Sequence, residues 1–129
     1  EVVRPGTDAT VLAWGPSIPL VLESAEAAAE QGIDLEVIDA RSLAPVDFPT
    51  IAESVRRTGR LMIVHEAPVL GGLGGEIAAR ISEQCFYHLE APVLRVGGYH
   101  LPYPPARMEH AYLPDLDRVL DGVDRLLEH

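Results

Sequence analysis

The chain has 129 residues, of which 47% are hydrophobic, and a formal net charge of -10 at pH 7. This length suits a single domain with its own core, and the apolar runs fall well short of the roughly 18 residues that a membrane span needs. The negative charge disfavours nucleic acid and membrane surfaces as partners and favours a basic protein surface.

The single cysteine, Cys85, falls on the apolar face of a predicted helix. It is most simply a small buried hydrophobic residue, and a chain without disulfides suits the reducing cytoplasm, where we expect this protein. Because Glu1 is not an initiator methionine and no signal-peptide pattern follows, we expect the chain to be part of a longer polypeptide. Residues 127–129 are either the native end of a helix or the junction of a histidine tag.

The first half of the chain alternates short apolar runs with amphipathic stretches. Residues 10–14 and 35–39 are predicted strands. Ser17 is predicted to cap a helix that ends at Gly32, and its apolar face holds Ile18, Val21, Leu22, Ala25 and Ala29. Asp47 is predicted to cap a second helix, with Pro49 in its first turn and an end at residues 58–59.

A strand, a glycine-rich turn and a helix follow at residues 60–86. The strand covers residues 61–64, the turn covers 71–75, and the helix begins near Glu76 and ends near residues 86–89. One apolar helix face is indicated by the four-residue spacing of Ile77, Ile81 and Cys85. Residues 91–96 are a fourth predicted strand, ended by two glycines.

The segment 99–114 contains four prolines, which cannot donate ladder hydrogen bonds or fit inside a helix. We therefore predict an extended arm that serves as an interface. Asp115 is predicted to cap a last helix with the apolar face Leu116, Val119, Leu120 and Val123. Strands that alternate with helices predict right-handed crossovers, so we expect residues 1–129 to form one three-layer α/β/α domain with a mostly parallel sheet.

The glycine-rich turn is a candidate phosphate site, since free N–H groups at a helix N-terminus can bind anions. The dinucleotide spacing fails, because Ile77 stands at the third glycine position, and no P-loop lysine follows. We favour plain helix packing here and keep a stand-alone phosphate-binding module as an alternative function.

The five histidines show no metal-ligand spacing, and no serine sits in a nucleophile elbow. His65 and Glu66 end a predicted strand, where site residues of open α/β sheets lie. We nevertheless favour a structural role in which Glu66 bonds to neighbouring backbone or pairs with an arginine at a domain contact. Arg41 could bind an anion, but we favour mutual pairing of Asp39 and Arg41. Glu53, Arg56 and Arg57 are predicted to form a solvated helix face. We therefore expect this chain alone to be inactive.

These features together resemble the C-terminal domain of the transketolase family over nearly the whole chain. The matching positions are Asp39, Arg41, Pro45, Asp47, Glu66, Gly71, Gly72, Glu76 and Ile77. The β subunits of branched-chain 2-oxo acid dehydrogenases are the most similar members, followed by those of pyruvate dehydrogenases. The residues that favour the former lie at 65–68 (His-Glu-Ala-Pro), 85–86, 89–92 (Leu-Glu-Ala-Pro), 95–96 and 98–99.

The resemblance implies a thiamine-diphosphate enzyme with α2β2 assembly. Thiamine diphosphate and Mg²⁺ would lie on the E1 α subunit and the β N-terminal domain, so no cofactor is expected on this chain. The part present here would pair with a second β subunit and dock the subunit-binding domain of the E2 acyltransferase. The same domain of a pyruvate dehydrogenase or of deoxyxylulose phosphate synthase is the alternative.

The resemblance also implies site residues. Glu90 matches the acidic position that contacts the E2 subunit-binding domain. The candidate positions for domain or subunit interfaces are Asp39, Arg41, His65, Glu66, Tyr99 and His100. His100 departs from the acidic residue usual after Gly-Tyr in this family, so we expect any contact that it makes to weaken as pH rises through the histidine range.

Overall fold

The computed structural model describes residues 1–98 and 113–128. Its strands form one five-stranded sheet in the order β1-β3-β2-β4-β5. In chain order the elements are β1 (Val2–Arg4), β2 (Ala9–Ala13), α1 (Ser17–Glu30), β3 (Leu35–Asp39), α2 (Phe48–Thr58), β4 (Leu61–Pro68), α3 (Leu73–Gln84), the 3₁₀ turn η1 (Phe86–His88), β5 (Leu94–Gly98) and α5 (Leu116–Leu127). Within these residues, no helix is both long and apolar enough to cross a bilayer.

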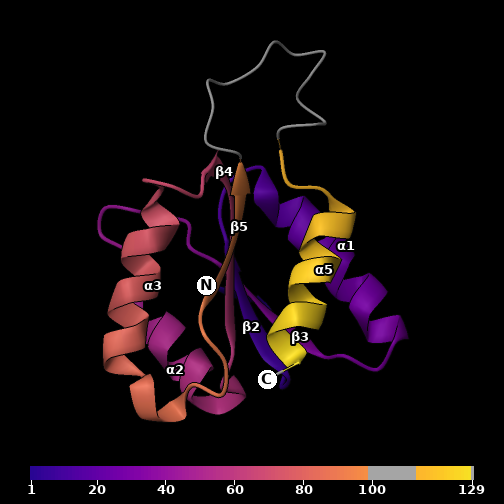
Figure 1. Cartoon of the computed structure of the whole chain (residues 1–129), viewed down its shortest axis with the longest axis horizontal. Coiled ribbons are helices and arrows are strands. Elements are labelled where there is room, and N and C mark those ends of the chain that lie inside the picture. Colours follow the sequence, from indigo (N-terminus) through magenta and orange to yellow (C-terminus); the bar gives the residue numbers. More distant parts are fainter. Residues whose placement is uncertain (99–112, 129) are drawn as a thin grey trace.

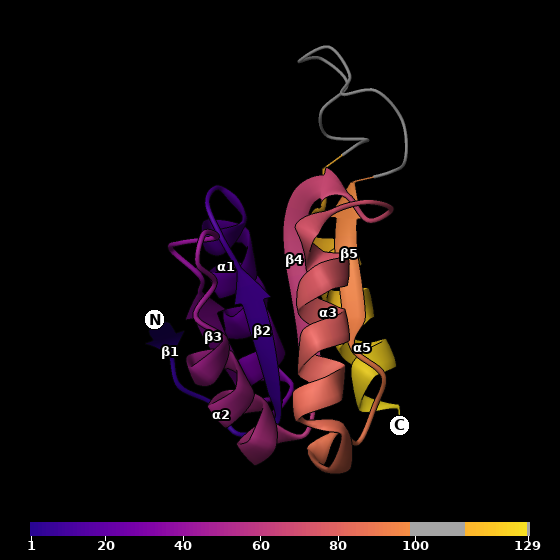
Figure 2. The ribbon, with the colours of Figure 1, turned by 90° about the vertical axis from the view of Figure 1, so that its left-hand side faces the viewer.

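The sheet is covered on both faces, which confirms the predicted three-layer α/β/α architecture. Helices α1 and α5 lie on one face, and α2 and α3 lie on the other (Figures 1 and 2). Strands β2, β3, β4 and β5 are parallel, whereas β1 pairs with β3 in the antiparallel sense. The sheet is therefore mostly parallel, as predicted.

Strand β4 illustrates why such a sheet needs two helical layers. Leu61 and Ile63 face the core beneath α2 and α3, while Met62 and Val64 face the core beneath α1 and α5. All four side chains are fully buried. A strand with apolar residues on both faces is typical of a central position in a parallel sheet.

Two of the three predicted helix caps are confirmed. The Asp47 carboxylate accepts a hydrogen bond from the Thr50 N–H at 3.2 Å, and Asp115 accepts one from the Arg118 N–H at 2.9 Å. The hydrogen bonds from the Thr50 hydroxyl and N–H hold the pKa of Asp47 below its ordinary value. The prediction for Ser17 is wrong, because the helix begins one residue earlier, with Pro16 at the cap and Ser17 buried in the first turn.

Several boundaries differ from the predictions. Strand β4 continues to Pro68, so His65 and Glu66 lie within the strand rather than at its end. Strand β5 begins at Leu94 and includes both following glycines, and α3 begins at Leu73, before Glu76. Strand β1 was not predicted, since it is only three residues long. The predicted arm, with Tyr99 and His100, lies outside the described residues except at its last two positions.

A buried polar network joins β3, β2 and α2. The Glu36 carboxylate accepts hydrogen bonds from the Ser54 hydroxyl at 2.5 Å, the Arg57 Nη2 at 2.6 Å and the Gly6 N–H at 3.3 Å. The Thr10 hydroxyl in turn lies 2.6 Å from that of Ser54. Glu53, Arg56 and Arg57 are all exposed, as predicted for a solvated helix face, and Arg57 in addition reaches the buried Glu36 carboxylate.

Candidate functional site

Glu90 stands at a corner that the fold builds from two distant loops. Its carboxylate accepts a hydrogen bond from Arg60 Nη1 at 2.7 Å, and its N–H donates to the Gly59 carbonyl at 2.8 Å. The Glu90 side chain is 61% exposed, whereas Arg60 is mostly buried. Glu90 is therefore accessible to a partner and already held in one orientation.

Gly59 makes this corner possible in two ways. It ends α2 with a φ of 74°, a left-handed conformation that favours glycine. A Cβ at Gly59 would lie 3.0 Å from both Cγ and Cδ of Glu90, so a side chain here would crowd the carboxylate. The glycine therefore serves both the helix end and the placement of Glu90.

His65 lies in β4 beside the C-terminal end of β2, and it is 1% exposed. From β2 the chain passes to β3 on one side and then to β4 on the other, so the switch point of the sheet lies between β2 and β4. Open α/β sheets usually bind their ligands in the crevice at this switch point. Here the rings of Trp14 and His65 stack across that point, with centroids 5.5 Å apart and planes at 21°. Two side chains thus fill the place where many related folds bind ligands.

The hydrogen bond of His65 determines its tautomer. Its Nδ1 lies 2.8 Å from the Ala67 carbonyl, which can only accept, so Nδ1 carries the proton. Its Nε2 is buried, has no hydrogen-bond partner among the described residues and is left as an acceptor. Neutral His65 fits this arrangement, whereas a protonated ring would hold an unpaired buried N–H and a buried charge.

Three glycines enclose the His65 ring. An added Cβ would lie 2.6 Å from Nε2 at Gly74, 2.7 Å from Cε1 at Gly97 and 3.1 Å from Cε1 at Gly72. Two of these glycines belong to the glycine-rich turn and the start of α3. The structure therefore supports the packing interpretation of this turn.

His65 predicts a pH dependence of stability. Burial lowers its pKa below the ordinary 6.5, the Ala67 hydrogen bond acts in the opposite direction, and Arg95 adds a further lowering. As pH falls below about 6.5, the unfolded chain binds a proton that the folded chain resists, so the free energy of unfolding decreases. Urea unfolding monitored at a series of pH values should show this loss, and His65→Gln should reduce it. Equal pH profiles for both proteins would contradict the assignment.

The other predicted site residues fall in separate places. Asp39 ends β3 and Arg41 follows it, at the same end of the sheet as His65 and Glu66, while Glu90 precedes β5 at the opposite end. The predicted pairing of the Asp39 and Arg41 side chains is wrong, because the Arg41 guanidinium pairs with Glu1 and only its backbone N–H reaches Asp39, at 2.9 Å. In the described part of the chain, no hydrogen bond or ion pair involves the Glu66 side chain.

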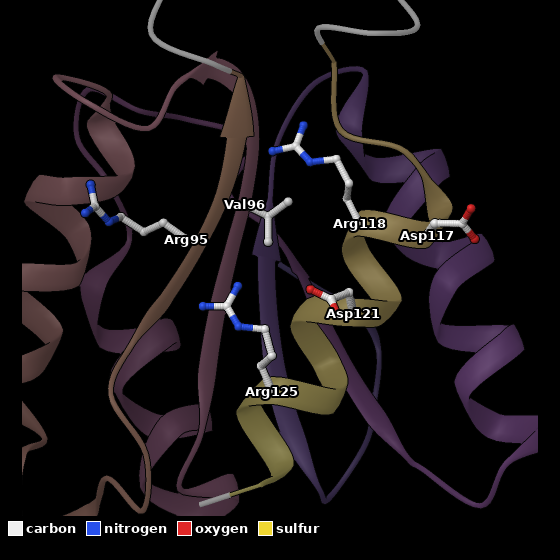
Figure 3. Close-up of a pocket in the computed structure, with 6 residues that line it drawn as sticks. All are labelled: Arg95, Val96, Asp117, Arg118, Asp121 and Arg125. Atoms are coloured by element: carbon white, nitrogen blue, oxygen red, sulfur yellow. The ribbon is translucent and has the colours of Figure 1, made fainter.

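A hollow of about 280 Å³ lies between β5 and α5. Figure 3 shows its lining residues, Arg95, Val96, Asp117, Arg118, Asp121 and Arg125. Arg95 points away from α5 and donates to the Val69 carbonyl at 3.0 Å, whereas Arg118 reaches β5 and donates to the Gly97 carbonyl at 2.5 Å (Figure 3). The charges are mixed and diverge, so this hollow is not built for a single anion.

Metal chemistry finds no support in residues 1–98 and 113–128, where no group of three or more histidine, cysteine or acidic side chains could hold an ion. Cys85 is fully buried, with Sγ 3.8 Å from the Ala52 carbonyl, which confirms its predicted role as a small core residue. Arg60 and Trp14 were not predicted as site residues. Arg60 carried no local signal, whereas Trp14 directly follows a strand beside the switch point.

Comparisons with known proteins find relatives of one kind, the transketolase C-terminal domain and the β subunits of 2-oxo acid dehydrogenases. The family "Transketolase, C-terminal domain" matches residues 1–119. The pyruvate dehydrogenase E1 component subunit beta of Leifsonia xyli is 53% identical over 129 residues, covering 100% of this chain and 38% of that protein. The 3-methyl-2-oxobutanoate dehydrogenase subunit beta of Mycobacterium tuberculosis is 54% identical over 127 residues, covering 98% of this chain and 36% of that protein.

Among solved structures, a split-gene transketolase described as an inactive beta4 tetramer superimposes with a TM-score of 0.82 at 30% identity. The match covers 99% of this chain and 41% of that one. This chain therefore spans well under half the length of each of these three relatives.

Proposed function

The chain belongs to the transketolase C-terminal domain family, and from this premise we propose that it is the assembly and docking domain of a 2-oxo acid dehydrogenase E1 β subunit. The observation that carries this proposal is the similarity along the whole chain to proteins named as such subunits, at 46–54% identity for the branched-chain group. The parent enzyme would oxidatively decarboxylate branched-chain 2-oxo acids and pass the acyl group to the lipoyl group of E2.

The branched-chain assignment is the finer part of the proposal. It is supported by residues 65–68 and 89–92, whose His-Glu-Ala-Pro and Leu-Glu-Ala-Pro motifs resemble that group. Pyruvate dehydrogenase is the second candidate, because a β subunit of that name is 53% identical to this chain. A substrate assay on the assembled α and β subunits, with pyruvate and 3-methyl-2-oxobutanoate in parallel, separates the two.

We place thiamine diphosphate and Mg²⁺ outside this chain. The described residues bring together no acidic or histidine cluster for the metal. The glycines that begin α3 pack against the His65 ring, where a phosphate cradle would require open N–H groups. These residues do not fit the cofactor, so the role proposed here is to hold the E1 α subunit, a second β subunit and E2 in place.

Glu90 is the proposed contact for the basic subunit-binding domain of E2. Its carboxylate is paired with Arg60 but remains 61% exposed, so it can accept a further hydrogen bond from a basic partner of a domain that is acidic overall. Opposite potentials of this kind accelerate and orient docking. The same physics requires the interaction to weaken as salt is added.

Glu90→Lys should weaken docking by about tenfold or more, because it replaces attraction by repulsion, and tenfold corresponds to about 1.4 kcal/mol. Calorimetric titration with the subunit-binding domain from the same organism measures this change. Glu90→Gln, which keeps the shape, should give an intermediate affinity. Glu23→Lys is the matched control, since Glu23 is an exposed glutamate on α1. Equal affinities for Glu90→Lys and the wild type would remove Glu90 from the interface.

A further inference from the structure

Two adjacent aromatic side chains on η1 stand in solvent. Phe86 is 67% exposed and Tyr87 is 94% exposed, and their rings meet edge to face with centroids 5.3 Å apart. The large exposed hydrophobic residues among those described are Val2, Leu43, Leu70, Phe86 and Tyr87. Contiguous exposed apolar surface on a domain of this size is a common sign of an interaction site.

The fold fixes these rings in their outward positions. Cys85 on one side of η1 is fully buried, and Leu89 on the other side packs against the same core. The N–H groups of His88 and Leu89 both donate to the Cys85 carbonyl, at 2.8 and 3.1 Å. Because η1 is held at both ends, Phe86 and Tyr87 are presented to a partner without a conformational change.

A hollow of about 530 Å³ lies beside Phe86. It is lined by Ser82, Phe86, Leu89, Glu90, Ala91, Pro92 and Val93. Glu90 is its one ionisable lining residue, and the rest are mainly apolar. An apolar hollow lined by a single carboxylate suits a partner protein that inserts an aliphatic side chain and carries a basic residue next to it.

We propose that Phe86, Tyr87 and this hollow form the apolar centre of the docking surface whose charged rim is Glu90. The occupant is an aliphatic side chain of the basic subunit-binding domain of E2, so this inference rests on the proposed function. The charge of the domain favours this occupant, since a net charge of -10 attracts a basic partner. The Glu90 carboxylate is paired with Arg60 but is 61% exposed, so it can also contact a cation of that partner. Buried aromatic anchors typically carry much of the binding energy of an interface.

The two parts of the surface have different physical signatures. The Glu90 contact depends on salt, because exposed charges are screened. The aromatic contact depends little on salt and gives binding a negative heat-capacity change, because apolar surface is buried. These signatures can be separated in one titration series.

The experiment uses Phe86→Ser, Tyr87→Ser, Glu90→Gln and the control Leu70→Ser. Leu70 is 65% exposed and lies in the turn between β4 and α3, so its exposure matches that of Phe86. Each protein is titrated with the E2 subunit-binding domain of the same organism at low and high salt and at several temperatures. All four positions are exposed, and unchanged melting temperatures confirm that the variants are folded.

We expect each aromatic variant to lose at least tenfold in affinity at both salt concentrations, with a smaller heat-capacity change and the same salt dependence. Glu90→Gln should mainly reduce the salt dependence, and Leu70→Ser should stay within twofold of wild type. Wild-type affinity in both aromatic variants would overturn this inference and leave the docking function standing. Failure of the wild type itself to bind would overturn the proposed function as well.

Sedimentation velocity of the same proteins tests the competing occupant. If Phe86→Ser abolishes self-association of the chain and leaves E2 docking unchanged, a second copy covers this surface and the inference is wrong. If self-association is unchanged and docking is lost, the inference is supported.

Discussion

Arg57→Met is expected to destabilise the domain by about 3 kcal/mol, the lower end of the cost of leaving a buried charge without its partner. The Arg57 Nη2 lies 2.6 Å from the Glu36 carboxylate, which is buried in β3. The Arg57 side chain is itself 53% exposed, and Ser54 and Gly6 still donate to Glu36, so the lower end of the range applies.

The neighbouring residue supplies the control for this measurement. Arg56 is exposed on the same helix and makes no ion pair in the described residues, so Arg56→Met should change the unfolding free energy by less than about 0.5 kcal/mol. Adding Glu36→Gln to Arg57→Met removes the unpaired charge and should recover much of the loss. Urea unfolding measures all four proteins. Similar losses in Arg56→Met and Arg57→Met would contradict the buried-pair explanation.

Gly74→Ala is expected to destabilise the domain by about 2 kcal/mol, within the range for overpacking a core. The new Cβ would lie 2.6 Å from Nε2 and 2.9 Å from Cδ2 of His65. The ring cannot retreat, because Trp14 stacks on it and Ala67 holds its Nδ1. This clash outweighs the roughly 1 kcal/mol that alanine gains over glycine in a helix.

The adjacent glycine gives the opposite expectation. A Cβ at Gly75 would meet only the end of the Arg95 side chain, at 3.3 Å, and that side chain can move. Gly75→Ala should therefore be neutral or stabilising by up to about 1 kcal/mol. In a His65→Ala background the cost of Gly74→Ala should largely disappear, because the ring that causes it is gone. A cost that persists there would show that another contact is responsible.

The predicted fold was largely correct because its signals are local. Short apolar runs between amphipathic stretches predicted the positions of β2, β3 and the first half of β4. The caps at Asp47 and Asp115 are hydrogen bonds within one helical turn, so they too are local. The predictions failed where pairing is remote. Strand β1 depends on contacts with β3 more than thirty residues away, and β4 extends past Val64 because β5 pairs with it as far as Pro68.

For the candidate site, too, local features were predicted and contacts between remote residues were not. The motif around Glu90 pointed to that residue, but nothing local indicated that Arg60 would orient it or that Phe86 and Tyr87 would stand exposed beside it. His65 was recognised by its place near a strand end, and its tautomer is set locally by Ala67. Its glycine surroundings and its stacking on Trp14 come from other segments of the chain.

The sequence by itself determined the order of strands and helices, the faces they bury and the family to which the chain belongs, since hydrophobic period, caps and motifs act over a few residues. Only the tertiary structure decided that Arg57 neutralises Glu36, that Trp14 and His65 fill the switch point, and that Arg60 holds Glu90 at an apolar hollow. These contacts join residues that the chain separates by about twenty to fifty positions. Their distances are set by packing of the whole sheet and its two helical layers, which no local pattern specifies.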